Sequence, residues 1–530
     1  MRLSYKRIAA CYFMIVAIMF ICILRLCSII LNPEYAMASE TASSRKISVG
    51  FSRGTIYDCN GLPITNSKIS YCNLIFDKPS AIVALYDVFD SAEIEIISDE
   101  IRNKGFAVRH TEEKISAEGI YSFATTEHSG EENPASHIIG YTDSEGKGVC
   151  GLELAYDDLL SSEEENYISF VVDGRGAALE GIEPSFSYDY KTESRGVRTT
   201  LDLTIQRIAE KNADNINCGA VVITEIETGK IRGLVSRPNY DLTRLGEALS
   251  DPNQPLLNRA LCTYNIGSVF KPYVVATGYE KKIFYYTKCK GYTDIDGLVF
   301  ACHNLGGHGD VNISSALKYS CNSFFYEYIQ SIGGRSVIEL SRKAGFESSI
   351  PLAKGLTCKA GSLGNTAVYE NSKRSLANLS IGQGELMLSP IAITNLYMAI
   401  ASDGCYRTPS LIEGEVEAGD LIKREPLPAK VRVMSETTAK KLRQDLAGVL
   451  EEGGTGKQAK PTLTTAAGKT GTAQTGIIKS GKKVTNSWFC GFFPLENPKY
   501  AVTVLSENAD KSCSAIFAAI ADEITAAERK

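Results

Sequence analysis

The most continuous hydrophobic pattern in the chain lies at its N-terminus. Ile8 to Leu24 form a run without a charged side chain, and apolar residues resume after Arg25, from Leu26 to Leu31. A stretch of this length crosses a bilayer if the long side chain of Arg25 extends to the membrane surface. The pattern predicts one transmembrane helix over residues 8–31, preceded by a short tail over residues 1–7.

The charges around this run predict its orientation. Arg2, Lys6 and Arg7 precede it, and basic flanks stay in the cytoplasm. We therefore expect the bulk of the chain, after about residue 31, to lie outside the membrane. A cleaved signal peptide is the alternative, because Ala36-Met37-Ala38 resembles a cleavage site. That site lies well beyond the apolar run, which is itself longer than in usual signal peptides, so an uncleaved anchor is favoured.

Two different patterns divide the remainder of the chain. In the first, short β-like runs alternate with acidic helical or loop segments such as Asp87–Glu100 and Ser161–Glu165. In the second, Ala220–Ile223 and Ile231–Val235 are apolar runs separated by the turn-forming segment Glu227–Lys230. Such a pair predicts a β-hairpin.

The second pattern begins near residue 216 and ends on further strands. A mostly helical stretch follows the predicted hairpin, and strand patterns return at Thr470–Thr475, Ser487–Phe493 and Tyr500–Leu505. Strands at both ends of a segment with helices between them favour one antiparallel sheet covered by helices. The pattern therefore predicts an α+β fold.

Composition adds limits on domain number and function. The chain has 530 residues, more than the roughly 250–300 that one hydrophobic core supports, so we expect two or three domains. A net charge of -6, without a cluster of Lys and Arg beyond the first residues, argues against nucleic-acid binding. The 15 cysteines are odd in number and scattered, which indicates no disulfide framework. Cys289 and Cys302 are the one pair that merits a test for a bridge.

The candidate chemistry begins with Ser268 and Lys271, which stand three residues apart. On a helix this spacing brings a hydroxyl and an amine onto one face, within hydrogen-bonding reach. Gly267 permits a sharp turn before the serine, and Pro272 is tolerated in a first helical turn. A serine needs an adjacent base to act as a nucleophile, and a lysine can serve when burial or another cation lowers its pKa.

The Ser-x-x-Lys pattern is weak evidence by itself, because the sequence contains five: Ser43, Ser144, Ser268, Ser315 and Ser480. Two further motifs distinguish Ser268. Ser320-Cys321-Asn322 offers a hydroxyl and an amide suited to relaying a proton and holding a substrate carbonyl. Lys469-Thr470-Gly471-Thr472 offers a cation, two hydroxyls and a glycine on a predicted strand, where a peptide carboxylate can bind.

In this order the three motifs resemble the active-site set of penicillin-binding proteins and serine β-lactamases. The similarity extends to class B penicillin-binding proteins, which are monofunctional peptidoglycan transpeptidases. Further matching segments are Arg53–Asp58 with Asn60-Gly61, Gly148 with Gly151-Leu152-Glu153, Thr200-Leu201-Asp202 with Gln206, Asn258-Arg259-Ala260, Ser380–Gly384 and Trp488–Phe492. Cys59 and Ile266 depart from the family pattern, which usually has arginine and proline there.

The resemblance implies an elongated, mostly β pedestal over residues 32–215 and a transpeptidase domain over residues 216–530. It implies that Ser268 attacks the penultimate D-Ala carbonyl of a stem peptide while Lys271 accepts its proton. The backbone N–H groups of Ser268 and Thr472 would form the oxyanion hole. An amine from a second stem peptide would then resolve the acyl-enzyme, and β-lactams would act as covalent inhibitors.

The remaining site residues also take roles from the resemblance. Ser320 and Lys469 would pass the proton to the departing D-Ala, and Asn322 would orient the donor peptide. The hydroxyls of Thr470 and Thr472 would bind its terminal carboxylate, and Gly471 would let the substrate approach the backbone closely. As a second cation, Lys469 would also lower the pKa of Lys271. No cofactor is implied. A site for glycan polymerisation is not expected either, so we predict a partner glycosyltransferase.

The anchor and the segment Arg53–Asn60 are the predicted contacts with this partner.

Two other chemistries are disfavoured. Gly453–Lys457 is no phosphate-binding loop, because Glu451 and Gln458 occupy the positions that need glycine and Ser or Thr. Ser362 lacks the first glycine of the Gly-x-Ser-x-Gly motif of Ser-His-Asp hydrolases.

A metal is not expected either. Two histidines and two cysteines offer possible ligand atoms, but their spacing matches no zinc pattern: His303, His308, Cys289 and Cys302. Among other proteins that react with penicillin, a β-lactamase needs neither anchor nor pedestal, a bifunctional synthase needs a glycosyltransferase domain, and a β-lactam sensor carries several membrane spans. A non-enzymatic scaffold is disfavoured because all three motifs are intact.

Overall fold

The computed structural model describes residues 2–31, 44–128, 133–143, 145–173, 178–179, 181–479, 481–509 and 512–529. The chain divides into two compact units that interleave along the sequence. The first unit consists of Met1–Arg53, Ser67–His128 and Ser162–Thr192. The second unit consists of Gly54–Asn66, Ser129–Ser161 and Glu193–Lys530.

Helix α1 spans Arg2–Leu31 and carries the predicted anchor. Its stretch Tyr5–Leu31 has a mean hydropathy of 2.8 and is long and apolar enough to cross a membrane. Within the described ranges it is the one helix that meets this test. The finding agrees with the predicted single span. The alternative cleavage site at Ala36-Met37-Ala38 lies outside the described residues.

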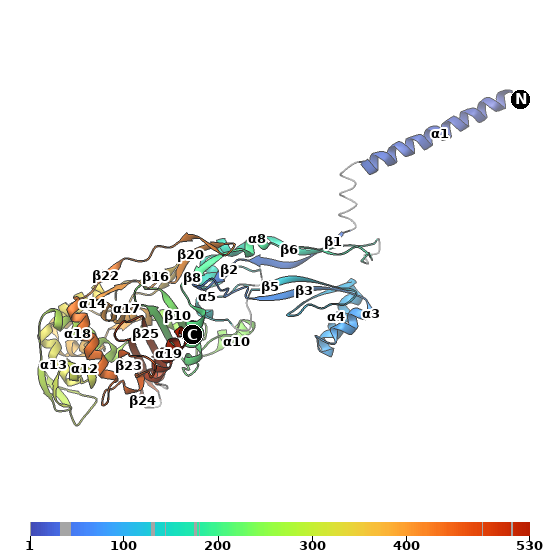
Figure 1. Ribbon diagram of the computed structural model, residues 1–530. Coiled ribbons are helices and arrows are strands. Elements are labelled where there is room, and N and C mark those ends of the chain that lie inside the picture. Colours follow the sequence, from blue (N-terminus) through green and yellow to red (C-terminus); the bar gives the residue numbers. More distant parts are fainter. Residues whose placement is uncertain are drawn as a thin grey trace. The chain divides into compact units, whose positions relative to one another are not determined.

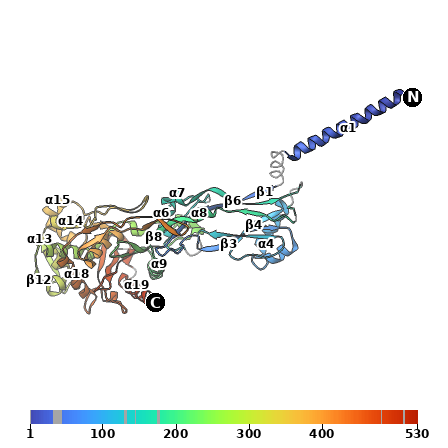
Figure 2. The same cartoon turned by 45° about the horizontal axis from the view of Figure 1, so that its top comes forward.

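The first unit packs helices against a mostly β core. Besides α1, its elements are β1 (Ser44–Arg53), β3 (Lys68–Phe76), α3 (Pro79–Leu85), α4 (Ser91–Lys104), β4 (Phe106–Thr111), β5 (Ile120–Glu127), β6 (Ser161–Val171), β7 (Ser185–Ser187) and α8 (Tyr190–Glu193). One sheet has the order β4-β3-β5 and another β1-β6-β7. Alternate residues of β3 face different cores, since Leu74 packs with Phe170 of β6 and Ile75 packs with Ile97 of α4. Helix α4 lies beside β4 in this unit (Figure 2).

One acidic segment differs from its predicted structure. Ser161–Glu165 begins strand β6 and is neither helix nor loop. Glu163, Glu164 and Glu165 are exposed there, so the strand places their charges in water while its backbone pairs in the sheet. The alternation of buried and exposed positions begins only at Asn166, which is buried. The exposed acidic residues break the alternating pattern, so the sequence did not indicate where the strand begins.

The second unit holds most of the chain. Its elements are β2 (Thr55–Tyr57), α5 (Ser136–Ile139), α6 (Gly151–Ala155), α7 (Asp157–Leu160), β8 (Arg195–Thr199), α9 (Leu203–Ala213), β9 (Gly219–Glu225), β10 (Ile231–Arg237), η1 (Leu242–Arg244), α10 (Leu245–Ser250), η2 (Arg259–Leu261), β11 (Tyr264–Asn265), η3 (Gly267–Phe270), α11 (Lys271–Glu280), β12 (Tyr286–Cys289), β13 (Tyr292–Ile295), β14 (Leu298–Ala301), β15 (Gly309–Asn312), α12 (Ile313–Lys318), α13 (Asn322–Ile332), α14 (Gly334–Lys343), β16 (Ile350–Ala353), β17 (Leu356–Cys358), α15 (Thr366–Asn371), α16 (Lys373–Ser380), β18 (Met387–Leu388), α17 (Pro390–Ala401), β19 (Cys405–Arg407), β20 (Ile412–Glu417), β21 (Asp420–Arg424), β22 (Lys430–Arg432), α18 (Glu436–Ala447), η4 (Gly448–Leu450), η5 (Lys457–Ala459), β23 (Ala467–Lys479), β24 (Lys482–Phe493), β25 (Tyr500–Ser506), η6 (Glu507–Ala509) and α19 (Cys513–Glu528).

The central sheet of this unit has the order β10-β9-β25-β24-β23, and its described pairs are all antiparallel (Figure 1). The predicted hairpin is confirmed as β9 and β10, and the three predicted C-terminal strands as β23, β24 and β25. Every residue of β25 is buried, because helices cover both faces of the sheet. The predicted antiparallel sheet covered by helices is therefore confirmed.

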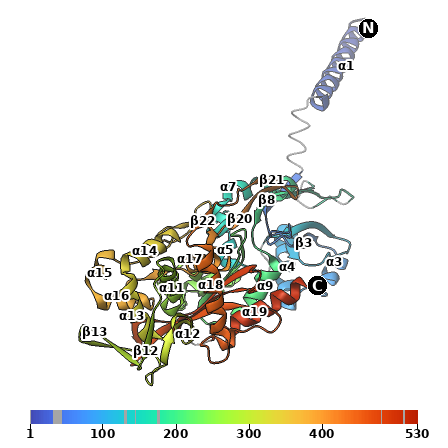
Figure 3. The ribbon, with the colours of Figure 1, turned by 60° about the vertical axis from the view of Figure 1, so that its left-hand side comes forward.

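Side chains on neighbouring strands show which helix covers which face. Thr503 of β25 lies 2.8 Å from Thr394 of α17, oxygen to oxygen. The ring centroid of Phe489 on β24 is 4.5 Å from that of Phe517 on α19. Thr503 pairs with Cys490, the neighbour of Phe489, so the two contacts lie on opposite faces. In Figure 3, α18 lies beside α17, and α9 lies beside α19.

Elements that precede residue 216 complete the second unit. Helix α9 packs on β10, where the Gln206 side chain pairs with the backbone of Leu234 through hydrogen bonds of 3.0 and 2.8 Å. A smaller sheet has the order β2-β8-β20-β21. It joins Ile56 to Val197 and Val197 to Glu415. The pairing of Ile56 with Val197 explains why the early segment Gly54–Asn66 belongs to the second unit.

Most of the segment predicted to contact the partner, Arg53–Asn60, is buried. Ile56 and Asp58 are fully buried and Thr55 is 4% exposed. One carboxylate oxygen of Asp58 accepts from the backbone N–H groups of Asn60 and Leu62, both at 2.8 Å. The segment therefore fixes a strand and the turn after it, and offers little surface to a partner.

Candidate active site

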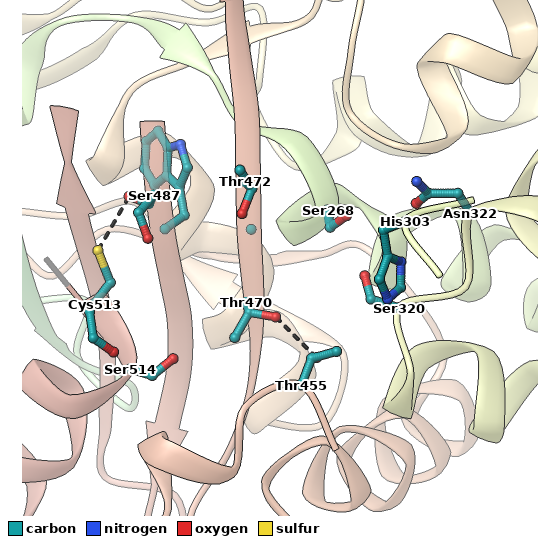
Figure 4. A pocket seen from close by; sticks show the side chains of 13 residues that line it. Ser268, His303, Ser320, Asn322, Thr455, Thr470, Thr472, Ser487, Cys513 and Ser514 are labelled. Atoms are coloured by element: carbon teal, nitrogen blue, oxygen red, sulfur yellow. Dashed lines mark hydrogen bonds between the residues drawn. The ribbon is translucent and has the colours of Figure 1, made fainter. Parts of the chain in front are cut away.

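An open cleft with a volume of about 410 Å³ lies in the second unit (Figure 4). Its lining residues come from segments far apart in sequence: Ser268, His303, Ser320, Asn322, Thr455, Thr470, Gly471, Thr472, Ser487, Trp488, Ser512, Cys513 and Ser514. The cleft thus brings together the three sequence motifs, with Lys271 and Lys469 fully buried. It is a polar groove, open at its mouth, of a size suited to a peptide.

Ser268 lies in the short 3-10 turn η3, directly before helix α11. Gly267 precedes it with φ +61°, and a Cβ there would lie 2.6 Å from the carbonyl oxygen of Thr472. The Gly267 N–H donates to the carbonyl oxygen of Gly382 at 2.9 Å. Only glycine fits in the narrow space between β23 and the segment around Gly382. The turn leaves Ser268 half-buried in the wall of the cleft.

Lys271 is fully buried and bonded to the second motif. Its Nζ donates to Ser320 O at 2.7 Å, to Ser320 Oγ at 3.0 Å and to Asn322 Oδ1 at 2.7 Å. These acceptors use all three N–H groups of an ammonium, whereas a neutral amine keeps a lone pair that can accept a proton. Burial lowers the pKa of Lys271 to about 7. Among the described residues, its recorded bonds go to Ser320 and Asn322, not to Ser268.

Lys469 lies on β23 and is also fully buried. Its Nζ donates to Thr470 O at 3.1 Å. Burial, and secondarily the charge of Lys271, lower the pKa of Lys469 well below its usual value. The sequence analysis assigned the lowered pKa of Lys271 to Lys469, whereas burial is its leading cause.

The third motif lies on the edge strand of the central sheet, β23. Gly471 faces the nucleophile turn, since a Cβ there would lie 2.9 Å from Val269 Cγ1 and 3.0 Å from Ile266 O. Thr470 Oγ1 donates to Thr455 Oγ1 at 3.1 Å (Figure 4). Glycine in this position lets the strand approach the turn closely enough to share one cleft with Ser268.

The second motif has an unusual backbone. Ser320 is buried with φ +53°, a left-handed conformation uncommon outside glycine. The next N–H, of Cys321, donates to Ala316 O at 2.9 Å, and Asn322 begins helix α13. Both side chains that hold Lys271 are therefore set by one tight turn between two helices.

Sequence reasoning missed several residues of the cleft: His303, Thr455, Ser487, Trp488, Ser512, Cys513 and Ser514. Thr455 belongs to the glycine-rich segment that predicted only a turn, and its N–H donates to Lys318 O at 3.1 Å. Trp488 is fixed by a bond from Nε1 to Asn265 O at 3.1 Å. For these residues the one signal in the sequence was that Trp488 belongs to Trp488–Phe492, a segment that resembles the family.

The other Ser-x-x-Lys serines do not reach the cleft where the structure describes them. Ser315 caps helix α12 in a reciprocal pair with Asn312. The remaining three lie outside the described residues: Ser43, Ser144 and Ser480. Cys289 and Cys302, the pair considered for a bridge, are free thiols.

Comparison with known proteins agrees with this geometry. Residues 219–526 match the family described as penicillin binding protein transpeptidase domain. Stage V sporulation protein D of Bacillus subtilis (strain 168) is 26% identical over 523 residues, covering 90% of this chain and 78% of that protein. Peptidoglycan D,D-transpeptidase MrdA of Escherichia coli (strain K12) is 24% identical over 561 residues, covering 90% and 86%.

Solved structures show the same fold. The crystal structure of penicillin-binding protein 3 from Mycobacterium tuberculosis, complexed with aztreonam, has a TM-score of 0.66 and 21% identity, covering 92% of this chain and 97% of that one. The chain therefore belongs to the penicillin-binding protein transpeptidase family, as a class B member. It is a serine-type peptidoglycan D,D-transpeptidase, in a family that works through an acyl-enzyme and is inhibited by β-lactams.

Proposed function

We propose that Ser268 forms the acyl-enzyme with the stem peptides of peptidoglycan. The observation that supports this assignment most directly is the buried Lys271, bonded to Ser320 and Asn322 beside the cleft that contains Ser268. A lysine whose pKa burial lowers to about 7 is available as a neutral base near neutral pH.

Acylation begins when Lys271, in its neutral form, accepts the Ser268 hydroxyl proton. Ser268 Oγ then attacks the carbonyl carbon of the penultimate D-Ala, and the carbonyl oxygen becomes an oxyanion. The backbone N–H groups of Ser268 and Thr472 stabilise this charge. They suit the task because β23 and η3 meet at Gly267 and Gly471.

The intermediate collapses when the peptide C–N bond breaks and the departing D-Ala amine takes up a proton. Ser320 and Lys469 relay that proton from Lys271. Asn322 orients the donor peptide, and Thr470 and Thr472 bind its terminal carboxylate. An acceptor amine then attacks the ester, forming the cross-link amide and returning the proton to Ser268 Oγ.

We also propose that residues 32–215 act as the pedestal and residues 216–530 as the transpeptidase domain. The mostly β first unit supports a separate non-catalytic part. With Arg2, Lys6 and Arg7 before the apolar stretch, α1 spans the membrane once with its N-terminus in the cytoplasm, and the catalytic cleft lies outside.

We also infer that this protein works with a partner glycosyltransferase. The cleft carries acyl-transfer groups, and glycan polymerisation needs a site of its own. With the β2 segment buried, the exposed apolar helix α1 is the remaining predicted contact with a membrane-embedded polymerase.

A reconstitution tests the proposed function. Purified full-length protein given a lipid-linked precursor should yield no glycan, and adding a separate polymerase should give cross-linked product. Ser268→Ala should abolish the cross-links and leave the glycan unchanged. Cross-links that persist in Ser268→Ala would contradict the assignment of the nucleophile. Glycan made by the protein alone would contradict the need for a partner.

A further inference from the structure

Three cysteines and one histidine meet beside the second motif. They come from the end of β12, the loop after β14, the loop before β15 and the turn before α13: Cys289, Cys302, His308 and Cys321. Their three Sγ atoms and one imidazole nitrogen all lie within 4.8 Å of one another. His308 Nδ1 is 3.6 Å from the Sγ atoms of both Cys289 and Cys302. The cysteines are 3%, 2% and 0% exposed, respectively.

These distances fit a tetrahedral metal ion. Zn–S bonds of about 2.3 Å and Zn–N bonds of about 2.0–2.1 Å place neighbouring sulfurs about 3.8 Å apart, and sulfur and nitrogen about 3.5 Å apart. The two Sγ to Nδ1 separations of 3.6 Å agree with the second value. Three thiolates and one imidazole are a soft donor set that selects zinc and fill all four positions of a structural site.

Packing alone accounts for the cluster poorly. Cysteines often fill a core as small hydrophobic side chains, but one imidazole nitrogen accepts a single good S–H hydrogen bond, and here two thiols lie equally close to it. A disulfide is absent among the three cysteines, which are free. The chain segment that carries two of them, from Tyr286 to Asn312, consists of the small two-stranded sheets β12-β15 and β13-β14. Isolated two-stranded ribbons are marginally stable in water.

We propose that Cys289, Cys302, His308 and Cys321 bind one Zn²⁺ ion, a site that the spacing of these residues along the chain does not predict. Each thiol releases its proton to solvent as its Zn–S bond forms. The ion joins the two small sheets to the start of helix α13. Because Cys321 lies between Ser320 and Asn322, the ion also fixes the turn whose side chains hold Lys271.

The ion is thus a positioning element and does not touch the substrate. It lies behind the second motif, while the residue after Cys302, His303, lines the cleft (Figure 4). This consequence for acylation rests on the proposed function of Ser320 and Asn322. The metal content does not, so the two are measured separately.

Metal content is measured on full-length protein purified in detergent without chelators, by elemental analysis and native mass spectrometry. We expect one zinc per chain in the unaltered protein and in Cys405→Ser, which removes a cysteine outside the cluster. Cys302→Ser and His308→Ala should lose most of the zinc, whereas His308→Cys, which restores a fourth soft ligand, should retain it. Protein that binds no zinc after incubation with zinc sulfate, or Cys302→Ser that retains it fully, would overturn the site.

A second measurement applies even if Cys302→Ser fails to fold. In the unaltered protein, Cys289, Cys302 and Cys321 should resist alkylation until a zinc chelator is added, and then react together. Acylation by a fluorescent penicillin should fall at least about tenfold on chelation, as for other losses of metal-site support, and recover when zinc is restored. Unchanged alkylation on chelation would overturn zinc binding. If the protein contains zinc but its acylation rate is unchanged after the zinc is removed, only the positioning role is overturned.

Discussion

Lys271 illustrates how single residues set the chemistry of the cleft. Its amine is buried with no carboxylate partner among the residues that the structure describes, and neutral acceptors from Ser320 and Asn322 hold it. Burying a charge this way is costly, so the neutral form is favoured and the pKa falls to about 7. In the proposed mechanism, the same contacts that position the amine therefore also prepare it to accept a proton.

At the scale of single residues, the substitution Lys271→Arg should abolish most acylation. A guanidinium stays protonated at any relevant pH and cannot act as a base. Labelling with a fluorescent penicillin should slow by about 10²–10⁴-fold, the range for loss of a general base. Lys281→Arg, in the C-terminal cap of the same helix and bonded to Ile332 O, should label at the normal rate. Near-normal labelling of Lys271→Arg would move the base elsewhere.

At the scale of elements, the site depends on the close approach of η3 and β23. Gly267 in η3 faces β23, and Gly471 in β23 faces η3. Neither position has room for a side chain. Gly382 belongs to the same contact, because a Cβ there would lie 2.0 Å from Gly267 O. The motifs around these glycines thus maintain a backbone distance, and the reactive side chains depend on it.

Gly267→Ala tests this contact. The substitution adds a left-handed strain of about 1–2 kcal/mol and a clash with Thr472 O at 2.6 Å. Penicillin labelling should fall by at least tenfold and the melting temperature by several degrees. Gly355→Ala shares a positive φ of +72° but meets nothing within 4 Å, so it should lower stability alone. Equal labelling by both variants would show that the contact does not matter.

The sequence predicts local structure well and long-range assembly poorly. Period and turn signals identified β9, β10 and the three C-terminal strands, because each is set by residues close in sequence. The pairing of Ile56 with Val197 leaves no such signal, so the interleaving of the two units could not be predicted. Short motifs placed Ser268, Ser320 and Asn322 in one cleft. Thr455 lies there because of the path that the backbone takes, which no local pattern indicates.

The cysteine–histidine cluster shows a further limit of motif reasoning. Cys289, Cys302 and His308 match no zinc spacing, because hairpins rather than a short loop bring them together. The fourth member, Cys321, is the middle residue of the second motif, in which the sequence pattern gives a role only to its neighbours Ser320 and Asn322. Three-dimensional proximity is the information that the sequence lacks.

At the scale of the whole molecule, α1 decides where the chemistry takes place. Its apolar stretch ends at Leu31, and the basic residues lie on its N-terminal side. In wall-stripped cells, external protease should digest the bulk of the chain and spare a cytoplasmic marker protein. Protection of the full-length chain with the membrane intact would refute the proposed orientation.

The central claim is that Ser268 is the nucleophile of a penicillin-reactive acyl transferase. Intact-protein mass spectrometry after incubation with benzylpenicillin tests it most directly. We predict one covalent adduct, carried by the peptide that contains Ser268, absent from Ser268→Ala and retained by Ser315→Ala, which alters another Ser-x-x-Lys serine. No adduct on the unaltered protein, or one that persists in Ser268→Ala, would contradict the account.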